Sequence, residues 1–213
     1  MSPILFQSSR EPLCLQYRSL ERWVHGELGS VDHERRVTEI ASKIFDLTWP
    51  LHGLTRDDRR LLHLAAMVHD VGRSVDDDTH PEQGARMLVQ AEHLPFDPNE
   101  RRALAYLTLY HRGKVPEPGA DEILRRADDH DLLRRILALL RAADALDSRA
   151  IESPRLMFEL IGRRLQVTCF LENDTPKARK VYTRPKKYRL MEELLDCRVD
   201  VRIATAQSLR MVA

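Results

Sequence analysis

The spacing of apolar residues follows two patterns along the chain, and a helical pattern covers most of it. Between residues 13 and 146 apolar side chains recur three or four positions apart, which is typical of helices that bury one face. Leu62, Ala65, Ala66 and His69, for example, fall on one stripe that ends in a histidine. We predict helices that start near residue 80 and over residues 13–25, 30–50, 55–70, 99–111 and 132–146.

Polar residues that cap helices mark several of these starts. Ser30 or Asp32 can cap the second helix, and Thr55 begins the third with acidic residues behind it. Thr79 and Glu82 have the spacing of a capping box, with a proline in the first helical turn between them. Each of these three starts therefore has a residue that can satisfy free backbone N–H groups.

Beyond Pro154 the pattern changes from helical to alternating. Residues 164–171 and 197–203 are rich in apolar and β-branched residues at every second position. Residues 186–195 between them have helical spacing. The sequence thus predicts a small strand–helix–strand element after the helices.

Length agrees with a mainly α fold that carries a small appendage. A chain of 213 residues is long enough to bury a sizeable core. We expect residues 1–155 to form a helical domain, with 1–12 as a loose lead-in. We expect residues 156–213 to form the α+β element, packed on that domain.

Charge and cysteine content narrow the class of protein. The formal net charge is +1, so no overall field favours nucleic acid or a membrane surface. Cys14, Cys169 and Cys197 lie far apart without CxxC spacing, which is typical of reduced thiols. The sequence shows neither an apolar run long enough to span a bilayer nor a signal-peptide pattern. We expect a cytoplasmic protein that binds neither membranes nor specific nucleic-acid sequences.

Histidines and aspartates interrupt the apolar faces of three predicted helices. His33, His69, Asp70 and Asp144 all fall on, or at the end of, an inner stripe. A buried carboxylate is costly unless it is paired, hydrogen-bonded or bound to a cation. Two imidazoles with two carboxylates suit Mn²⁺, Fe²⁺ or Mg²⁺ better than Zn²⁺, so we predict that these side chains hold a divalent ion. The competing interpretation is a set of unrelated buried polar groups, each with its own hydrogen-bond partner.

Two further histidines extend this candidate site. His80 begins one predicted helix and His111 ends the next. They can hold a second ion, with Asp70 bridging the two ions, or assist proton transfer. Two such ions would clamp the attacking and leaving oxygens of a phosphoryl displacement. A solvent-facing His80 and a His111 packed under the following loop are the plain alternatives.

Cations close to these positions are candidates for binding a phosphate. Arg73 follows the His69-Asp70 pair, and a guanidinium can bind a phosphate through two parallel hydrogen bonds. Arg112 and Lys114 follow His111 and are candidates of the same kind. The basic stretch 177–189 can contact a polyanion, although a solvated helix face is the commoner explanation.

These residues resemble the HD superfamily of metal-dependent phosphohydrolases. His69-Asp-Val-Gly-Arg73 is similar to its HD-x-G-K/R stretch, and His80-Pro-Glu-Gln-Gly84 to the helix start that supplies a second-metal histidine. Leu109-Tyr-His-Arg-Gly113 is similar to the next ligand segment, and Leu140-Arg-Ala-Ala-Asp-Ala-Leu-Asp147 to the helix with the last aspartate. The resemblance implies an HD-type helical bundle.

Within the superfamily, order and spacing look most like the C-terminal region of the exopolyphosphatase/guanosine pentaphosphate phosphatase family. The likeness covers about residues 19–203. The full-length enzymes carry catalysis in actin-like domains, and this sequence has neither their Gly-rich phosphate loops nor their parallel sheet. The resemblance therefore implies the HD module alone, with all four primary ligand positions kept.

One departure from the superfamily limits the expected activity. Its cyclic-dinucleotide phosphodiesterases have two adjacent histidines in the third ligand segment, followed by a GYP motif. Here Arg112 stands at the second histidine position and GYP is absent. The resemblance therefore argues against that activity and leaves the second metal site one ligand poorer.

We expect a metal-dependent phosphohydrolase that uses one Mn, Fe or Mg ion, or two. It would act on a phosphoester or phosphoanhydride of a nucleotide or polyphosphate through metal-activated water, with Asp70, His80 and His111 as catalytic groups. One alternative is a non-catalytic module that binds polyphosphate or a guanosine polyphosphate; another is a docking domain for a separate catalytic chain. The expected partner is a phosphate-rich small molecule or polyphosphate, and a homodimer is left open.

Overall fold

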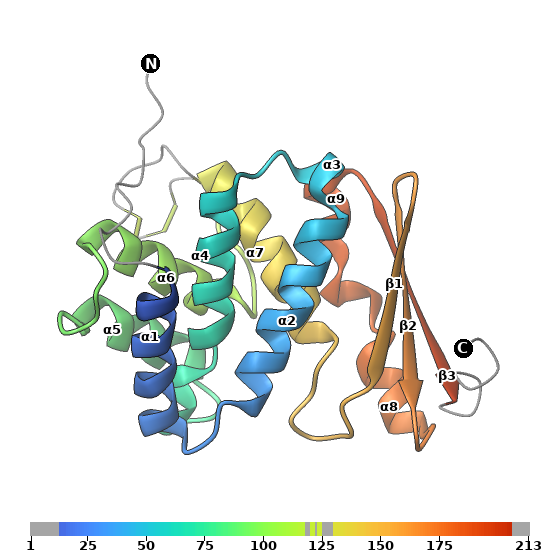
Figure 1. Cartoon of the computed structure of the whole chain (residues 1–213), viewed down its shortest axis with the longest axis horizontal. Helices are drawn as coiled ribbons and strands as arrows, with labels where there is room; N and C mark the ends of the chain where they lie inside the picture. The colour runs from blue at the N-terminus through green and yellow to red at the C-terminus, as the bar shows by residue number, and fades with distance from the viewer. Residues whose placement is uncertain (1–12, 118–119, 122, 125–129, 206–213) are drawn as a thin grey trace.

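Helices come first along the chain, and a small sheet follows them (Figure 1). The computed structural model describes residues 13–117, 120–121, 123–124 and 130–205. The predicted lead-in over residues 1–12 lies outside this part, as do residues 206–213. The first part of the chain forms α1 (Leu13–Leu28), α2 (Asp32–Leu47), α3 (Trp49–His52), α4 (Arg56–Val68), the 3₁₀ turn η1 (Val71–Ser74), α5 (His80–Gln90), α6 (Pro98–Tyr110) and α7 (His130–Ala145).

A three-stranded sheet lies at one end of the helical bundle (Figure 1). It consists of β1 (Arg155–Ile161), β2 (Arg164–Leu171) and β3 (Arg198–Thr205), in the spatial order β1-β2-β3. β1 pairs antiparallel with β2, whereas β2 and β3 are parallel. The parallel connection runs through α8 (Pro176–Tyr182), the 3₁₀ turn η3 (Pro185–Lys187) and α9 (Arg189–Leu195).

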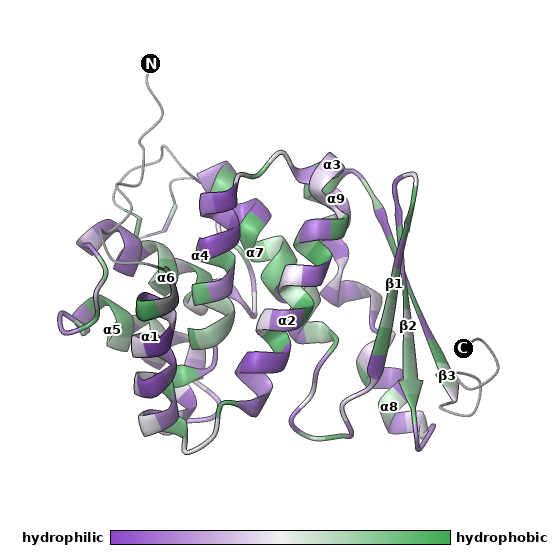
Figure 2. Cartoon of the chain, in the orientation of Figure 1, coloured by the Kyte–Doolittle hydropathy of each residue, from purple (hydrophilic) through white to green (hydrophobic). Residues whose placement is uncertain are grey.

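One apolar core runs from the bundle into the C-terminal elements. α4 lies in its middle, and residues 64–68 of this helix are fully buried. Cys169 of β2 and Met191 and Leu195 of α9 belong to the same buried cluster. α9 packs against α7, and β1 packs against α2. Apolar residues accordingly concentrate on the central helices and the strands, with polar residues on the outer turns of α1 and α2 (Figure 2).

The predicted mainly α fold is confirmed, and so is the strand–helix–strand unit of β2, α9 and β3. β1 and α8 were not predicted. Side chains of β1 alternate between half-buried and exposed, but Met157 and Ile161 are apolar on the exposed face. The sequence of β1 therefore lacks the alternation of apolar and polar residues that marks a strand with one polar face. α8 has seven residues, too few for a helical period to be distinguished.

The predicted caps are partly correct. The Thr55 side chain accepts a hydrogen bond from the backbone N–H of Asp58, and the Asp58 side chain accepts one from the backbone N–H of Thr55. α4 therefore begins with a capping box. The capping box predicted at Thr79 is wrong, because its hydroxyl donates to Asp76 (2.8 Å) instead of capping α5.

Two other predictions about helix ends are also wrong. Val31 holds the cap position of α2, while Ser30, one residue earlier, donates to the Asp32 side chain and accepts from the backbone N–H of Asp32 at 3.3 Å. α1 continues through Gly26 to Leu28, so its predicted end at residue 25 was too early. Among the described residues, no helix has the length and apolarity needed to cross a membrane.

Candidate metal centre

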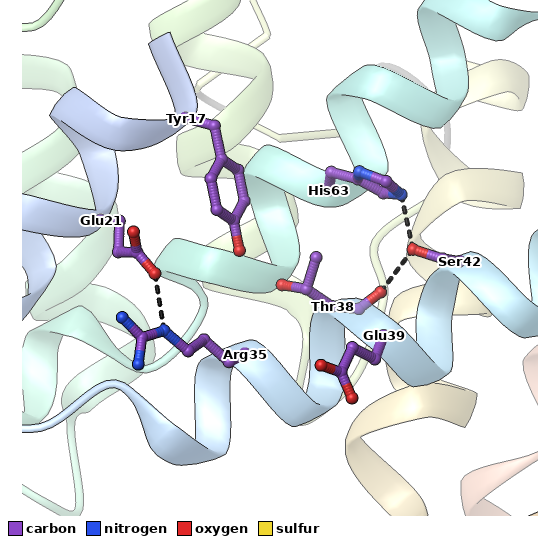
Figure 3. Close-up of a pocket in the computed structure, with 7 residues that line it drawn as sticks. All are labelled: Tyr17, Glu21, Arg35, Thr38, Glu39, Ser42 and His63. Atoms are coloured by element: carbon purple, nitrogen blue, oxygen red, sulfur yellow. Dashed lines mark hydrogen bonds and ion pairs between the residues drawn. The ribbon is translucent and has the colours of Figure 1, made fainter. Parts of the chain in front are cut away.

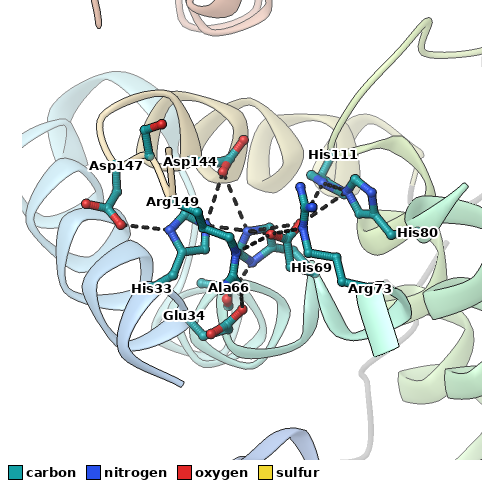
Figure 4. Close-up of polar contacts among 12 residues, drawn as sticks. His33, Glu34, Ala66, His69, Arg73, His80, His111, Asp144, Asp147 and Arg149 are labelled. Atoms are coloured by element: carbon teal, nitrogen blue, oxygen red, sulfur yellow. Dashed lines mark hydrogen bonds and ion pairs between the residues drawn. The ribbon is translucent and has the colours of Figure 1, made fainter. Parts of the chain in front are cut away.

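The six ligand-type side chains predicted from the sequence meet where several helix ends converge (Figure 4). All six are buried. They come from the first turn of α2, the junction of α4 and η1, the start of α5, the end of α6 and the last turn of α7. These residues are His33, His69, Asp70, His80, His111 and Asp144.

The first half of the cluster joins α2, α4 and α7. Asp144 Oδ1 lies 3.5 Å from His33 Nε2 and 3.6 Å from His69 Nε2. Asp70 lies next to both rings: its Oδ2 is 3.8 Å from His33 Nε2, and its Oδ1 is 3.8 Å from His69 Nε2. Two imidazole nitrogens and two carboxylates thus face a common point.

The second half shares Asp70 with the first. Asp70 Oδ1 is 3.2 Å from His80 Nε2 and 3.4 Å from His111 Nε2, and the two Nε2 atoms are 3.3 Å apart. The ligand atoms of these three residues all lie within 4.8 Å of one another, as do those of His33, His69 and Asp70. Asp70 is therefore placed to bridge two neighbouring cation positions.

Each of the four histidines is held by its other ring nitrogen. His69 Nδ1 lies 2.8 Å from the carbonyl of Ala66, and His80 and His111 make the same contact with backbone carbonyls at 2.6 Å. His33 Nδ1 lies 2.7 Å from Asp147 Oδ2. A carbonyl can only accept, so Nδ1 carries the proton in the rings of His69, His80 and His111, and their Nε2 atoms point into the cluster. This is the arrangement found around metal-binding histidines.

Two polar atoms at the centre of the cluster make no hydrogen bond within the described residues. His69 Nε2 and Asp70 Oδ1 are fully buried and have no hydrogen bond in the described structure. Leaving a buried polar atom unsatisfied costs about 1–3 kcal/mol, and more when it is charged. A divalent cation would satisfy both atoms at once, so the residues present fit such an ion.

Electrostatics keep the carboxylates ionised. Burial alone would raise the pKa of Asp70, but His69, His111 and His80 surround it and hold that pKa well below its usual range. The pKa of Asp144 is lowered in the same way by His33 and His69. Burial likewise opposes the charged form of His33, yet Asp144 and Asp147 raise its pKa to about 9.

Two arginines neutralise the outer oxygen of Asp70. Arg73 Nε donates to Asp70 Oδ2 at 2.7 Å, and Arg149 Nε donates to the same oxygen at 3.1 Å. Arg149 also pairs with Glu34, a fully buried carboxylate whose Oε2 has no partner. The sequence singled out Arg73 but gave no signal for Arg149 or Glu34, because neither belongs to a recognised ligand segment.

Asp147 is the other polar residue that the sequence reasoning missed. Besides His33, it binds Arg36 Nε (3.0 Å) and the hydroxyl of Ser153 (2.7 Å). Its position three residues after Asp144, at the end of the segment Leu140-Arg-Ala-Ala-Asp-Ala-Leu-Asp147, was the one available signal. The structure makes it the residue that orients His33.

The remaining phosphate candidates lie outside this network. Arg112 and Lys114 are exposed, and within the described residues their side chains form no ion pair with the cluster. The backbone carbonyl of Arg112 instead accepts from Arg141.

A separate pocket of about 690 Å³ lies beside α1, α2 and α4 (Figure 3). Its lining includes the ion pair of Arg35 and Glu21 (2.7 Å) and the pair of Ser42 and His63, with Oγ 2.6 Å from Nε2. Ser42 donates its proton to the carbonyl of Thr38, so His63 must donate to Ser42 and cannot act as its base. The pocket contains none of the cluster residues and offers no activated nucleophile.

One protein family matches the part of the chain that contains the cluster. The family described as Ppx/GppA phosphatase, domain III, matches residues 29–175. The match includes His33, His69, Asp70, His80, His111 and Asp144, together with β1 and β2. This chain belongs to the Ppx/GppA phosphatase family and carries its domain III.

Proposed function

We propose that this protein is a cytoplasmic HD-type phosphohydrolase that depends on a divalent metal. Its substrate would be a phosphoanhydride or phosphoester of a polyphosphate or nucleotide. The observation that carries the proposal is the set of four imidazoles, each tied at Nδ1, whose Nε2 atoms converge on Asp70 and Asp144. The family is one of phosphatases, which supports hydrolysis of phosphate compounds.

The cluster would provide two sets of metal ligands that share Asp70. His33, His69, Asp70 and Asp144 would hold the first ion, and Asp70, His80 and His111 would hold a second. Such an ion supplies Lewis-acid polarisation of a phosphoryl oxygen and lowers the pKa of water. Oxygen and nitrogen ligands of this mixture favour Mn²⁺, Fe²⁺ or Mg²⁺.

The surrounding cations would bind and orient the substrate. Arg149 and Arg73 hold Asp70 Oδ2, and their side chains are 35% and 19% exposed. Each guanidinium therefore has donors left that can reach a phosphate entering from solvent. Glu34 holds Arg149 from the buried side, which fixes the direction of its fork. His80 and His111 are placed to take or give a proton at Nε2 in a site with one ion.

The test combines metal analysis with turnover. We expect the purified protein to contain Mn, Fe or Mg, and to release phosphate from at least one member of a panel of nucleotides and polyphosphates supplied with Mn²⁺. Asp70→Ala should lower turnover at least about a hundredfold and keep the helical circular dichroism, because it removes a ligand shared by both halves.

The matched control is Asp46→Ala. Asp46 is an exposed carboxylate paired with Arg59 at 2.8 Å on the surface, so its loss should leave turnover unchanged. A protein without bound metal or turnover, or full activity in Asp70→Ala, would contradict the proposal.

A second candidate function is binding without hydrolysis. It is favoured by the second half of the cluster, which has three ligand residues in the described structure, while the neighbouring Arg112 is exposed. The protein would then sense polyphosphate or a guanosine polyphosphate. Calorimetric binding of such a compound without release of product would support this function over hydrolysis.

A further inference from the structure

Lys187 belongs to the C-terminal element but lies near α7, the helix that carries Asp144. It ends η3, which packs against α7, the helix that carries Asp144 in its last turn. Its side chain is half-buried, whereas its neighbour Lys186 on the same turn is exposed. The small element therefore buries one lysine, and not the adjacent one, near the helix that carries Asp144.

Among the described residues, the ammonium of Lys187 makes neither a hydrogen bond nor an ion pair. Three charges act on it: Asp144 attracts it, while Arg112 and Arg184 repel it. Burial adds to the repulsion and lowers the pKa of Lys187. A half-buried, unpaired cation is unfavourable unless an anion joins it.

Two neighbouring arginines add positive charge around Lys187. Arg112 and Arg184 are exposed, and in the described part of the chain neither side chain makes an ion pair. Asp144 cannot balance all three cations, because its Oδ1 already faces His33 and His69. A divalent ion bound at Asp144 would add further positive charge on that side.

We propose that Lys187, with Arg112 and Arg184 around it, binds a second phosphate group of the substrate, next to the group held at the metal centre. The site would therefore prefer compounds with two or more linked phosphates over a single phosphate. This inference rests on the proposed function, because it takes the metal centre as the place of the first phosphate. It also assigns a role to the C-terminal element, which contributes Lys187 and Arg184.

Calorimetry with the Mn²⁺-loaded protein tests the inference. The probes are imidodiphosphate, whose P–N–P bridge resists hydrolysis, and orthophosphate. Lys187→Ala should weaken imidodiphosphate binding about tenfold or more, because it removes a charged hydrogen bond. Binding of orthophosphate should change less than about twofold, and the bound Mn²⁺ should be unchanged.

Lys186→Ala is the matched control, since it removes the same charge from the exposed neighbour. It should leave both affinities within about twofold of wild type. Lys187→Arg should restore most of the imidodiphosphate affinity, because the charge returns at the same place. Equal losses in Lys186→Ala and Lys187→Ala would overturn the inference, as they would show general attraction by the basic surface.

Metal-free protein separates this inference from the proposed function. After treatment with EDTA, wild type should still bind imidodiphosphate more tightly than Lys187→Ala, although both bind more weakly. If wild type binds no metal but keeps this difference, the hydrolase proposal fails and the phosphate site stands. If wild type binds metal and hydrolyses its substrate but Lys187→Ala matches it with both probes, the inference fails alone.

Discussion

At the scale of single residues, the orientation of His33 depends on a carboxylate outside the ligand set. Asp147 Oδ2 lies 2.7 Å from His33 Nδ1 and so directs Nε2 towards Asp144. Outer partners of this kind typically contribute 10–100-fold to metal affinity. We expect Asp147→Ala to weaken Mn²⁺ binding by about that factor in calorimetry, with Asp147→Asn in between because an amide oxygen still accepts.

The expected loss is specific to the contact with His33. Helical circular dichroism should stay as in wild type, because Asp147 lies after the end of α7. Removing the surface carboxylate in Asp46→Ala should leave Mn²⁺ affinity unchanged. Mn²⁺ affinity equal to wild type in Asp147→Ala would show that packing alone orients the ring.

His63 makes a prediction about pH that does not involve the metal. Burial and the charge of Arg59 lower its pKa from 6.5 to about 4. Between these values the unfolded chain binds a proton that the folded protein does not, so stability is lost as the pH falls from 6.5 towards 4. In His63→Gln this loss should be smaller by up to about 3 kcal/mol, measured as the free energy of unfolding in urea at a series of pH values.

The free energy of unfolding of His63→Gln is subtracted from that of wild type at each pH, so that the contributions of other titrating groups cancel. Above pH 7 the difference in free energy of unfolding between wild type and His63→Gln should be constant, since His63 is then neutral in the folded and unfolded states. A difference between wild type and His63→Gln that does not change from pH 7 to pH 4 would mean that the ring is protonated as easily in the pocket as in water.

The burial of the candidate ligand residues was predictable because the helical period determines which side a residue faces. His33 and Asp144 fall four positions from Val37 and Leu140, so periodicity alone placed them inside. Arg149 and Glu34 were not predictable in this way. Glu34 is adjacent to His33 in sequence, and its pairing with a residue beyond α7 exists only in the tertiary structure.

At the scale of elements, η1 and α5 approach each other too closely for a side chain between them. A Cβ added at Gly72 would lie 2.1 Å from the carbonyl oxygen of His80 and 2.4 Å from the backbone nitrogen of Gly84. Backbone atoms cannot rotate away, so α5 would have to move and take His80 with it. We expect Gly72→Ala to lower the free energy of unfolding in urea by about 2 kcal/mol or more.

Gly26 provides the matched control on α1. A Cβ added there meets nothing within 4 Å, and the residue lies inside the helix. Gly26→Ala should therefore leave stability unchanged or raise it by up to about 1 kcal/mol, since alanine favours helix. Equal effects of the two substitutions would show that the contact between η1 and α5 is loose.

The elements also show where local sequence signals stop being sufficient. Thr55 and Thr79 each precede an acidic residue at capping-box spacing, yet only Thr55 forms the box. Asp76 in the preceding loop binds both the hydroxyl and the backbone N–H of Thr79, and so competes with the cap. Whether the capping box forms therefore depends on the conformation of the preceding loop. The spacing between the two residues of the box carries no information about that loop.

At the scale of the whole molecule, the sheet and the bundle share one core and hold the site together. We propose that residues 156–213 form an element that packs on the helical part and has no separate stability. The hydroxyl of Tyr182 on α8 donates to the carbonyl of Glu152 (2.7 Å), and Arg36 on α2 donates to the carbonyl of Pro154 (2.8 Å). Both contacts tie the segment after α7 between the two parts.

This arrangement predicts a single unfolding transition, and the chain contains probes for both parts. Trp23 and Trp49 lie on α1 and α3, while Cys169 and Cys197 are buried thiols in the C-terminal element. Burial raises the pKa of Cys169 to about 12 and that of Cys197 to about 11, so neither reacts while the element is folded. In a Cys14→Ser background, tryptophan fluorescence and thiol labelling should give the same urea midpoint within about 0.2 M. Labelling that precedes the fluorescence change would mean that the sheet opens first, and η3 with Lys187 would then separate from α7 while the bundle remained folded.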